Sequence, residues 1–217
     1  MIPFRTPAEI GAAISAVVTH LSRRGVIAYP TETIYGLGSS VSTAAVDRLS
    51  ALKGRPAGKP FLLLVSAREM VAKVGLRLTD AGERLAAAFW PGPLTLVVPG
   101  GERTLPDLLR GPEGGIAVRW TSHPGASRIV SVLGAPITST SANRPRQEPA
   151  EDGPGVEAIF RDEVAAGTLL ILDAGRLRTS LPSTVIDCTG TVPRLVREGA
   201  VRASALRAVV PALADGA

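Results

Sequence analysis

Short, wholly apolar segments alternate with segments of helical periodicity along most of the chain. The apolar segments are predicted to be buried strands: 26–29, 61–65, 94–98, 116–120, 137–140, 168–172 and 184–188. The periodic segments are predicted to be helices: 7–24, one capped by Thr43, 79–89, 125–133, 156–166 and a tail helix at 203–217. Strands that are apolar throughout need helices on both faces of their sheet. We therefore expect an α/β fold, with a twisted, mostly parallel or mixed open sheet flanked by helices.

Capping residues mark where several helices begin and end. Thr6-Pro7-Ala8-Glu9 has the spacing of a capping box, with proline at the first helical position, and Ser66-Ala67-Arg68-Glu69 repeats that spacing. Thr43 is predicted to be the N-cap of a helix whose core side carries Val46, Leu49 and Leu52. Gly25 is expected to end the first helix.

The composition predicts one globular domain and excludes several classes of protein. The 217 residues are 45% hydrophobic, enough for one core in a single domain spanning 1–217. No run of about 18 apolar residues occurs, which excludes a membrane-spanning helix. The N-terminus lacks an export signal, so a cytoplasmic location is expected. A single cysteine, Cys188, excludes an internal disulfide and, with only two histidines, argues against zinc.

The net positive charge of the chain favours an anionic ligand. The 24 Lys and Arg exceed the 19 Asp and Glu by five, a small excess for a protein that wraps nucleic acid. Lysine is rare, and two of the three lysines, Lys53 and Lys59, lie close together. This clustering is either chance or a requirement for a compact ammonium with three donors.

Common catalytic motifs are absent. The 54–60 segment is one residue too short for a phosphate-binding P-loop, and Pro60 stands where the loop needs a hydroxyl. Gly36-Leu37-Gly38 lacks the third glycine of a dinucleotide fingerprint. A Ser/His/Asp triad is conceivable with His123, but a lone histidine is far more often structural or on the surface.

Polar segments instead interrupt the apolar pattern where strands should end, and open α/β sheets bind ligands there. These segments are 29–38, 53–60, 138–143, and Ser183-Thr184 with Arg197-Glu198-Gly199. The four hydroxyls of 138–141 form either a hydrogen-bonding platform or an edge strand. Arg119 interrupts an apolar strand and needs an anion, either a substrate carboxylate or a distant Asp or Glu. The polar segment 145–155 is either a lid or a surface loop.

Together these segments resemble the YrdC/TsaC family over about 6–201. The similarity rests on these motifs: Tyr29-Pro30-Thr31-Glu32-Thr33-x-Tyr35-Gly36-Leu37-Gly38, Lys53-x-Arg55-Pro56, Trp90-Pro91-Gly92-Pro93-Leu94-Thr95, Arg119 with His123-Pro124, Ser139-Thr140-Ser141-Ala142-Asn143, and Ser183-Thr184-Val185-Ile186-Asp187 with Arg197-Glu198-Gly199. The resemblance implies a single YrdC-like domain with a large, concave, basic cleft.

The resemblance also implies an activity. Members condense L-threonine, bicarbonate and ATP into L-threonylcarbamoyladenylate and pyrophosphate, and partner threonylcarbamoyl transferase proteins use the product to modify tRNAs that read ANN codons. ATP is thus an expected substrate, with Mg²⁺ held mainly by its phosphates. Weak tRNA binding is a further expectation.

The family's functional positions fall on ten residues of this sequence. Those expected to contact ATP are Lys53, Arg55, Lys59, Ser141, Asn143 and Arg197; Lys53, Arg55, Ser141 and Asn143 form the expected catalytic signature. Those expected to bind L-threonine are Thr33, Arg119, Ser139 and Ser183, with Arg119 on the carboxylate.

Two departures from the family pattern leave other functions open. Many relatives continue the Ser-Ala-Asn motif with Ser-Gly, whereas Arg144-Pro145-Arg146 follows Asn143 here. Some relatives have a threonine-binding histidine where this chain has Leu64. One alternative is an RNA-binding or regulatory module without synthase activity. Another is carbamoyl transfer from a different amino acid or from carbamoyl phosphate.

Overall fold

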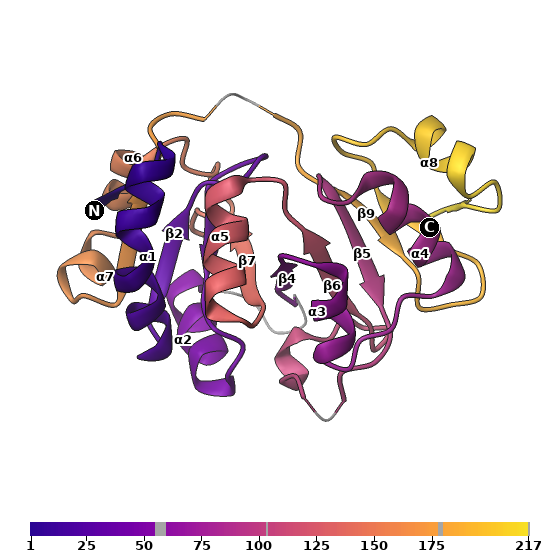
Figure 1. Ribbon diagram of the computed structural model, residues 1–217, viewed down its shortest axis with the longest axis horizontal. Helices are drawn as coiled ribbons and strands as arrows, with labels where there is room; N and C mark the ends of the chain where they lie inside the picture. The colour runs from indigo at the N-terminus through magenta and orange to yellow at the C-terminus, as the bar shows by residue number, and fades with distance from the viewer. Residues whose placement is uncertain (55–59, 103, 178–179, 217) are drawn as a thin grey trace.

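The computed structural model describes residues 1–54, 60–102, 104–177 and 180–216 (Figure 1). The strands are β1 (Ile2–Pro3), β2 (Val26–Tyr29), β3 (Gly36–Gly38), β4 (Leu62–Val65), β5 (Leu94–Val98), β6 (Ile116–Trp120), β7 (Ile137–Ser141), β8 (Leu169–Asp173), β9 (Thr184–Asp187), β10 (Arg194–Arg197) and β11 (Ala214–Asp215). The helices are α1 (Pro7–Ser22), α2 (Thr43–Lys53), α3 (Arg68–Lys73), α4 (Asp80–Phe89), α5 (Pro124–Leu133), α6 (Gly153–Ile159), α7 (Arg161–Ala165) and α8 (Ala203–Val209), with a 3₁₀ turn, η1 (Asp107–Leu109).

The strands form one mixed sheet, which confirms the predicted α/β class. Their order is β1-β8-β2-β3-β7-β4-β6-β5-β9-β10-β11. The pairs β1–β8, β2–β8, β4–β6, β5–β9 and β10–β11 are parallel, and the remaining neighbours are antiparallel. The strands β7, β4, β6 and β5 are therefore adjacent at the centre of the sheet, although they are distant in the sequence.

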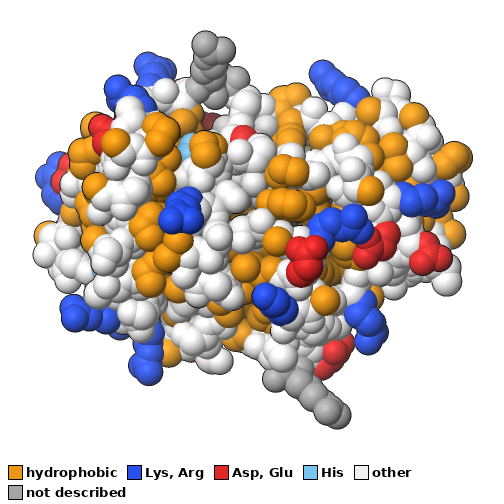
Figure 2. All heavy atoms as spheres, viewed as in Figure 1, with side chains coloured by type: hydrophobic (Ala, Val, Ile, Leu, Met, Phe, Trp, Pro, Cys, Tyr) orange, Lys and Arg blue, Asp and Glu red, His pale blue; other side chains and the backbone are white. Residues whose placement is uncertain are grey.

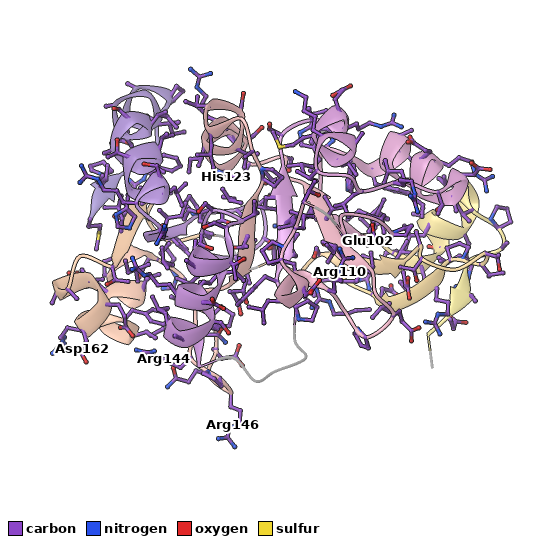
Figure 3. The ribbon with its side chains drawn as sticks, turned by 90° about the horizontal axis from the view of Figure 1, so that it is seen from below. Glu102, Arg110, His123, Arg144, Arg146 and Asp162 are labelled. Atoms are coloured by element: carbon purple, nitrogen blue, oxygen red, sulfur yellow. The ribbon has the colours of Figure 1, made fainter. Side chains whose placement is uncertain are left out.

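Helices cover both faces of the sheet. α1 and α5 lie side by side on one face, and α2 lies on the opposite face (Figures 1 and 3). Every residue of β2 is buried, as are Val46, Leu49 and Leu52 of α2, so the predicted core positions are confirmed. The apolar strands thus have helix on both sides, as their lack of polar alternation indicated.

Several predicted helix ends are wrong by a residue or more. The capping box at Thr6 is confirmed, but Ser42 rather than Thr43 is the N-cap of α2, and Ala67 rather than Ser66 precedes α3. The left-handed backbone that follows α1 belongs to Arg24, with φ of 63°. Gly25 is required for a different reason: a Cβ there would lie 2.3 Å from the His20 ring.

The two C-terminal helix predictions need larger corrections. The predicted helix 156–166 is two helices, because Phe160 leaves the helical conformation with φ of −121° and its side chain is buried. The predicted tail helix 203–217 ends at Val209, two residues before Pro211. Ala214–Asp215 then forms β11, which pairs with β10.

Candidate functional site

Strand β7 divides its hydroxyl groups between the two faces of the sheet. Because side chains alternate along a strand, Ser139 and Ser141 share one face. Thr138 points to the other face, where its Oγ1 accepts the backbone N–H of Ser39 at 2.8 Å. β7 pairs with β3 and β4, so it is not an edge strand. The segment 138–141 is therefore not the edge strand of the second alternative. It agrees with the hydrogen-bonding platform, to which Ser139 and Ser141 contribute hydroxyls on the same face.

A cavity of about 350 Å³ lies on the Ser139 face. Six residues predicted for the site line it: Thr33, Arg119, Ser139, Ser141, Ser183 and Arg197. Thr31 and Thr95 also line it and were not predicted as site residues. The described lining residues include two guanidinium groups and no carboxylate. The cavity is therefore suited to an anionic ligand that also accepts hydrogen bonds from hydroxyls.

Arg119 is buried at the base of this cavity, with only 3% of its surface exposed. Its Nε lies 3.7 Å from Oε1 of Glu32, and neither atom makes a hydrogen bond to a described residue. Oε2 of Glu32 accepts the Thr121 hydroxyl at 2.6 Å. The predicted need for an anionic partner is thus met in part by Glu32. The long contact leaves the guanidinium able to bind a second carboxylate from the cavity.

Arg197 brings a second guanidinium to the same cavity from the end of β10. Its Nη2 donates to the Ser183 carbonyl at 2.7 Å, and the Ser183 hydroxyl lies 2.9 Å from that of Thr95. Burial and the nearby charge of Arg119 lower the pKa of Arg197. Two cations close enough to repel one another favour an anion between them.

The turn after β2 fixes the hydroxyl of Thr33. Oγ1 of Thr31 accepts the backbone N–H groups of Thr33 and Ile34, both at 3.1 Å, and donates to the Ile34 carbonyl at 2.7 Å. The hydroxyls of Thr31 and Thr33 lie 3.0 Å apart. Such local side-chain-to-backbone bonds hold a turn without regular structure. The Thr33 side chain is consequently held at the cavity wall.

Lys53, at the end of α2, joins the end of β7. Its Nζ donates to the carbonyls of Ser141 at 2.7 Å and Asn143 at 2.6 Å, and also contacts the Asn143 side-chain oxygen. The Ser141 hydroxyl donates to that same oxygen at 2.6 Å. The compact ammonium therefore gathers Ser141 and Asn143 beside the cavity. Arg55 and Lys59, the other predicted phosphate contacts of this segment, lie outside the described residues.

The remaining titratable candidates have structural roles. Nδ1 of His123 accepts the Ala126 N–H at 3.2 Å as the N-cap of α5, and burial holds the pKa of His123 below its ordinary value (Figure 3). Burial raises the pKa of the Cys188 thiol to about 12. Neither residue lines the cavity. The described residues thus offer this cavity no histidine or cysteine nucleophile.

The described parts of the chain contain no group of three His, Cys, Asp or Glu side chains that could hold a metal ion. None of the described helices has the length and apolar character to span a bilayer. The Glu32 carboxylate, which contacts the cavity-lining Arg119, also accepts the Thr121 hydroxyl.

Three residues that shape the site lay in the motifs of the resemblance but were not among the predicted site residues: Thr31, Glu32 and Thr95. The signal for Glu32 was present, because it is the only acidic residue of the polar segment 29–38 and a buried arginine needs a carboxylate. Thr95 ends the 90–95 motif of the resemblance, but its place in the site follows from its contact with Ser183, which no local pattern reveals. Leu64 is fully buried and pairs with Arg119 in the sheet.

Comparison with known proteins gives this geometry a family context. A family model, Sua5_yciO_yrdC, described as telomere recombination, matches residues 19–199. A threonylcarbamoyl-AMP synthase of Pyrococcus abyssi is 33% identical over 186 residues, covering 85% of this chain and 53% of the relative. One from Thiobacillus denitrificans is 39% identical over 178 residues, covering 81% and 91%. One from Bacillus subtilis is 32% identical over 202 residues, covering 91% and 56%.

Solved structures agree over nearly the whole chain. P. abyssi Sua5 complexed with L-threonine superposes with a TM-score of 0.87 at 30% identity, covering 99% of this chain and 62% of that one. E. coli YciO superposes with a TM-score of 0.79 at 27% identity, covering 94% and 97%. The chain thus spans about half the length of the P. abyssi and B. subtilis relatives, and nearly the full length of YciO.

Proposed function

Because the chain belongs to the Sua5/YciO/YrdC family, we propose that it is a threonylcarbamoyl-AMP synthase, a nucleotidyltransferase that consumes L-threonine, bicarbonate and ATP. One observation supports this most directly. A single cavity holds two guanidinium groups beside a row of hydroxyls, and Lys53 holds Ser141 and Asn143 at its edge. The wall can accommodate both a small zwitterion and an anionic phosphate chain.

L-Threonine is proposed to bind at the buried end of the cavity. The Arg119 guanidinium would pair with its carboxylate, since Glu32 engages Arg119 only at 3.7 Å. The hydroxyls of Thr33, Ser139 and Ser183 would bind its amine and hydroxyl groups. L-threonine is bound in the solved structure of P. abyssi Sua5, whose fold covers 99% of this chain.

ATP is proposed to bind between α2, the end of β7 and Arg197. Lys53, Ser141, Asn143 and Arg197 would contact its phosphates, and by family resemblance Arg55 and Lys59 would join them. A bound Mg²⁺ would neutralise charge on the leaving pyrophosphate. Since the described residues offer it no cluster of ligands, it would be held by phosphate oxygens and water.

The reaction needs positioned groups more than a protein nucleophile. The threonine amine adds to bicarbonate and water leaves, giving a carbamate. A carbamate oxygen then attacks the α-phosphorus of ATP; the new O–P bond forms as the bond to the β-phosphate oxygen breaks, releasing pyrophosphate. Arg119 would hold the amino acid and the nucleotide-binding residues would hold the α-phosphate in line. Such positioning can supply much of the rate enhancement.

Downstream roles are part of the same proposal. The product would pass to threonylcarbamoyl transferase proteins that modify tRNA in the cytoplasm. The rival proposal, an RNA-binding module, lacks a supporting feature on the face with α1 and α5. Lys and Arg side chains are scattered over that face rather than gathered into one patch (Figure 2). A phosphate-binding surface would concentrate them.

The test is pyrophosphate release by the purified chain. Release should require L-threonine, bicarbonate and ATP together, and mass spectrometry should detect threonylcarbamoyl-AMP. Serine in place of threonine, and carbamoyl phosphate in place of bicarbonate, test the alternative transfer reactions. Absence of release, together with tight RNA binding that weakens steeply with salt, would overturn the proposal and favour the binding module.

A further inference from the structure

Arg144, which directly follows the Ser141-Ala142-Asn143 motif, contacts α2, α7 and the bend between α6 and α7. Its Nη1 donates to the Leu52 carbonyl of α2 at 2.6 Å, and its Nη2 donates to Oε1 of Glu163 on α7 at 2.7 Å. The guanidinium carbon lies 4.7 Å from the centre of the buried Phe160 ring. Figure 3 shows Arg144 against the body of the molecule, whereas Arg146 projects away from it.

The contacts of Arg144 and Lys53 cross between the same two chain segments. Lys53 reaches from the end of α2 to the carbonyls of Ser141 and Asn143, and Arg144, next to Asn143, reaches back to the carbonyl of Leu52, next to Lys53. Two opposed contacts restrain sliding and rotation of the segments more than one contact can. The end of α2 and the end of β7 are consequently held together at the residues proposed to bind ATP.

The contacts of residue 144 with Leu52, Glu163 and Phe160 suit arginine in particular. The last carbonyls of a helix lack partners within it, and a cation there interacts favourably with the helix dipole. The planar guanidinium serves the Leu52 carbonyl and the Glu163 carboxylate with separate nitrogens while its face stacks on Phe160. Oε2 of Glu163 is buried without a hydrogen bond, so removing Arg144 would leave that carboxylate with no charged partner among the described residues.

We infer that Arg144 is a positioning residue for the nucleotide, setting ATP affinity by holding Lys53, Ser141 and Asn143 together. The inference rests on the proposed function. Arg144 does not line the cavity, and its contacts lie on the side of α2 and α7. Its effect should therefore fall on ATP and spare L-threonine, whose proposed partners lie on β6, on β7, in the turn after β2 and directly before β9.

The experiment compares Arg144→Ala, Arg144→Lys and Glu163→Gln with Arg176→Ala, which removes an exposed guanidinium paired with Glu151. Affinities for a non-hydrolysable ATP analogue and for L-threonine are measured by calorimetry, and KM for each from pyrophosphate release. Amide exchange of Asn143 and Gln147, with α1 as an internal reference, reports on the turn without any ligand.

Arg144→Ala should weaken analogue binding about tenfold, equivalent to about 1.4 kcal/mol, with L-threonine affinity changed less than twofold. Faster exchange at Asn143 and Gln147 should accompany it. The analogue affinities of Arg144→Lys and Glu163→Gln should lie between those of wild type and Arg144→Ala. The analogue affinity of Arg176→Ala should equal that of wild type.

Equal losses for both ligands, or unchanged exchange at Asn143 and Gln147, would overturn the inference. If Arg144→Ala fails to fold, the same comparison of ligand affinities and amide exchange is made with the milder variants Arg144→Lys and Glu163→Gln. Failure of the proposed function has a different signature: wild type itself would bind no analogue and release no pyrophosphate, while amide exchange would still decide whether Arg144 holds the turn.

Discussion

Oε1 of Glu32 and Nε of Arg119 face each other beside the cavity at 3.7 Å, and neither makes a hydrogen bond to a described residue. This is a charge pair without the short contact of a strong ion pair. Glu32 is in turn fixed by the Thr121 hydroxyl. Glu32 thus balances the charge of the buried guanidinium through a long contact that leaves Arg119 able to bind another carboxylate.

Arg119→Ala should raise the KM for L-threonine about a hundredfold and that for ATP less than threefold, because a charge-assisted contact to the substrate carboxylate is lost. Arg119→Lys should recover only part of the loss, since an ammonium cannot reproduce a two-pronged contact. Pyrophosphate-release kinetics with each substrate varied provide the measurement. Arg68→Ala, at an exposed pair with Glu83, serves as the control. Equal effects on both substrates would remove the carboxylate role.

Glu32→Gln should lower the free energy of unfolding by about 3 kcal/mol, because the buried Arg119 loses its charged partner while Thr121 keeps an acceptor. L-Threonine should then raise the melting temperature more in the variant than in wild type, since its carboxylate replaces the missing charge. Thermal and denaturant unfolding with and without L-threonine test both statements. The exposed Glu148→Gln is the matched control. A variant as stable as wild type would show that Glu32 does not support Arg119.

Burial of short strands was predictable because it depends on local composition. The predicted segments 94–98 and 116–120 coincide with β5 and β6. β3 was missed because Gly36–Gly38 carries almost no side-chain pattern; a Cβ on Gly38 would lie 2.4 Å from the Thr138 carbonyl. Pairing with β2 on one side and β7 on the other is what makes β3 a strand.

The residue types at the site were predictable, but their contacts were not. Arg119 was recognisable as a cation in an apolar strand, yet its partner Glu32 belongs to a turn distant in sequence. Arg144 was visible only as a departure from the family pattern. Its contacts with Leu52 and Glu163 join three segments that have no local relationship. Spacing within one segment carries no information about such contacts.

The two tyrosines, Tyr29 and Tyr35, should resist ionisation in the native protein. Burial raises the pKa of Tyr35 from 10.0 to about 12 and that of Tyr29 further. Ultraviolet titration should show tyrosinate near pH 10 only in denaturant. Because the folded chain holds protons that the unfolded chain loses, the free energy of unfolding should fall as the pH rises from about 10 toward 12. Tyr35→Phe should remove the tyrosine ionisation that occurs at the lower pH in the native protein. Tyrosine ionisation near pH 10 in the native protein would contradict the effect of burial.

Lys53→Ala should reduce adenylate formation at least about a hundredfold while leaving the fold intact, because a charge proposed to face the triphosphate is lost together with the contacts that gather Ser141 and Asn143. Lys53→Arg should lose most of the activity too, since a planar fork cannot direct three donors to one small cluster of oxygens. By family resemblance, Arg55→Ala is expected to reduce adenylate formation as much as Lys53→Ala does.

The matched control is Lys73→Ala, which removes an exposed lysine at the end of α3. Circular dichroism checks the fold, and pyrophosphate release gives the rate. Near-wild-type turnover in Lys53→Ala would place the phosphates elsewhere in the cavity.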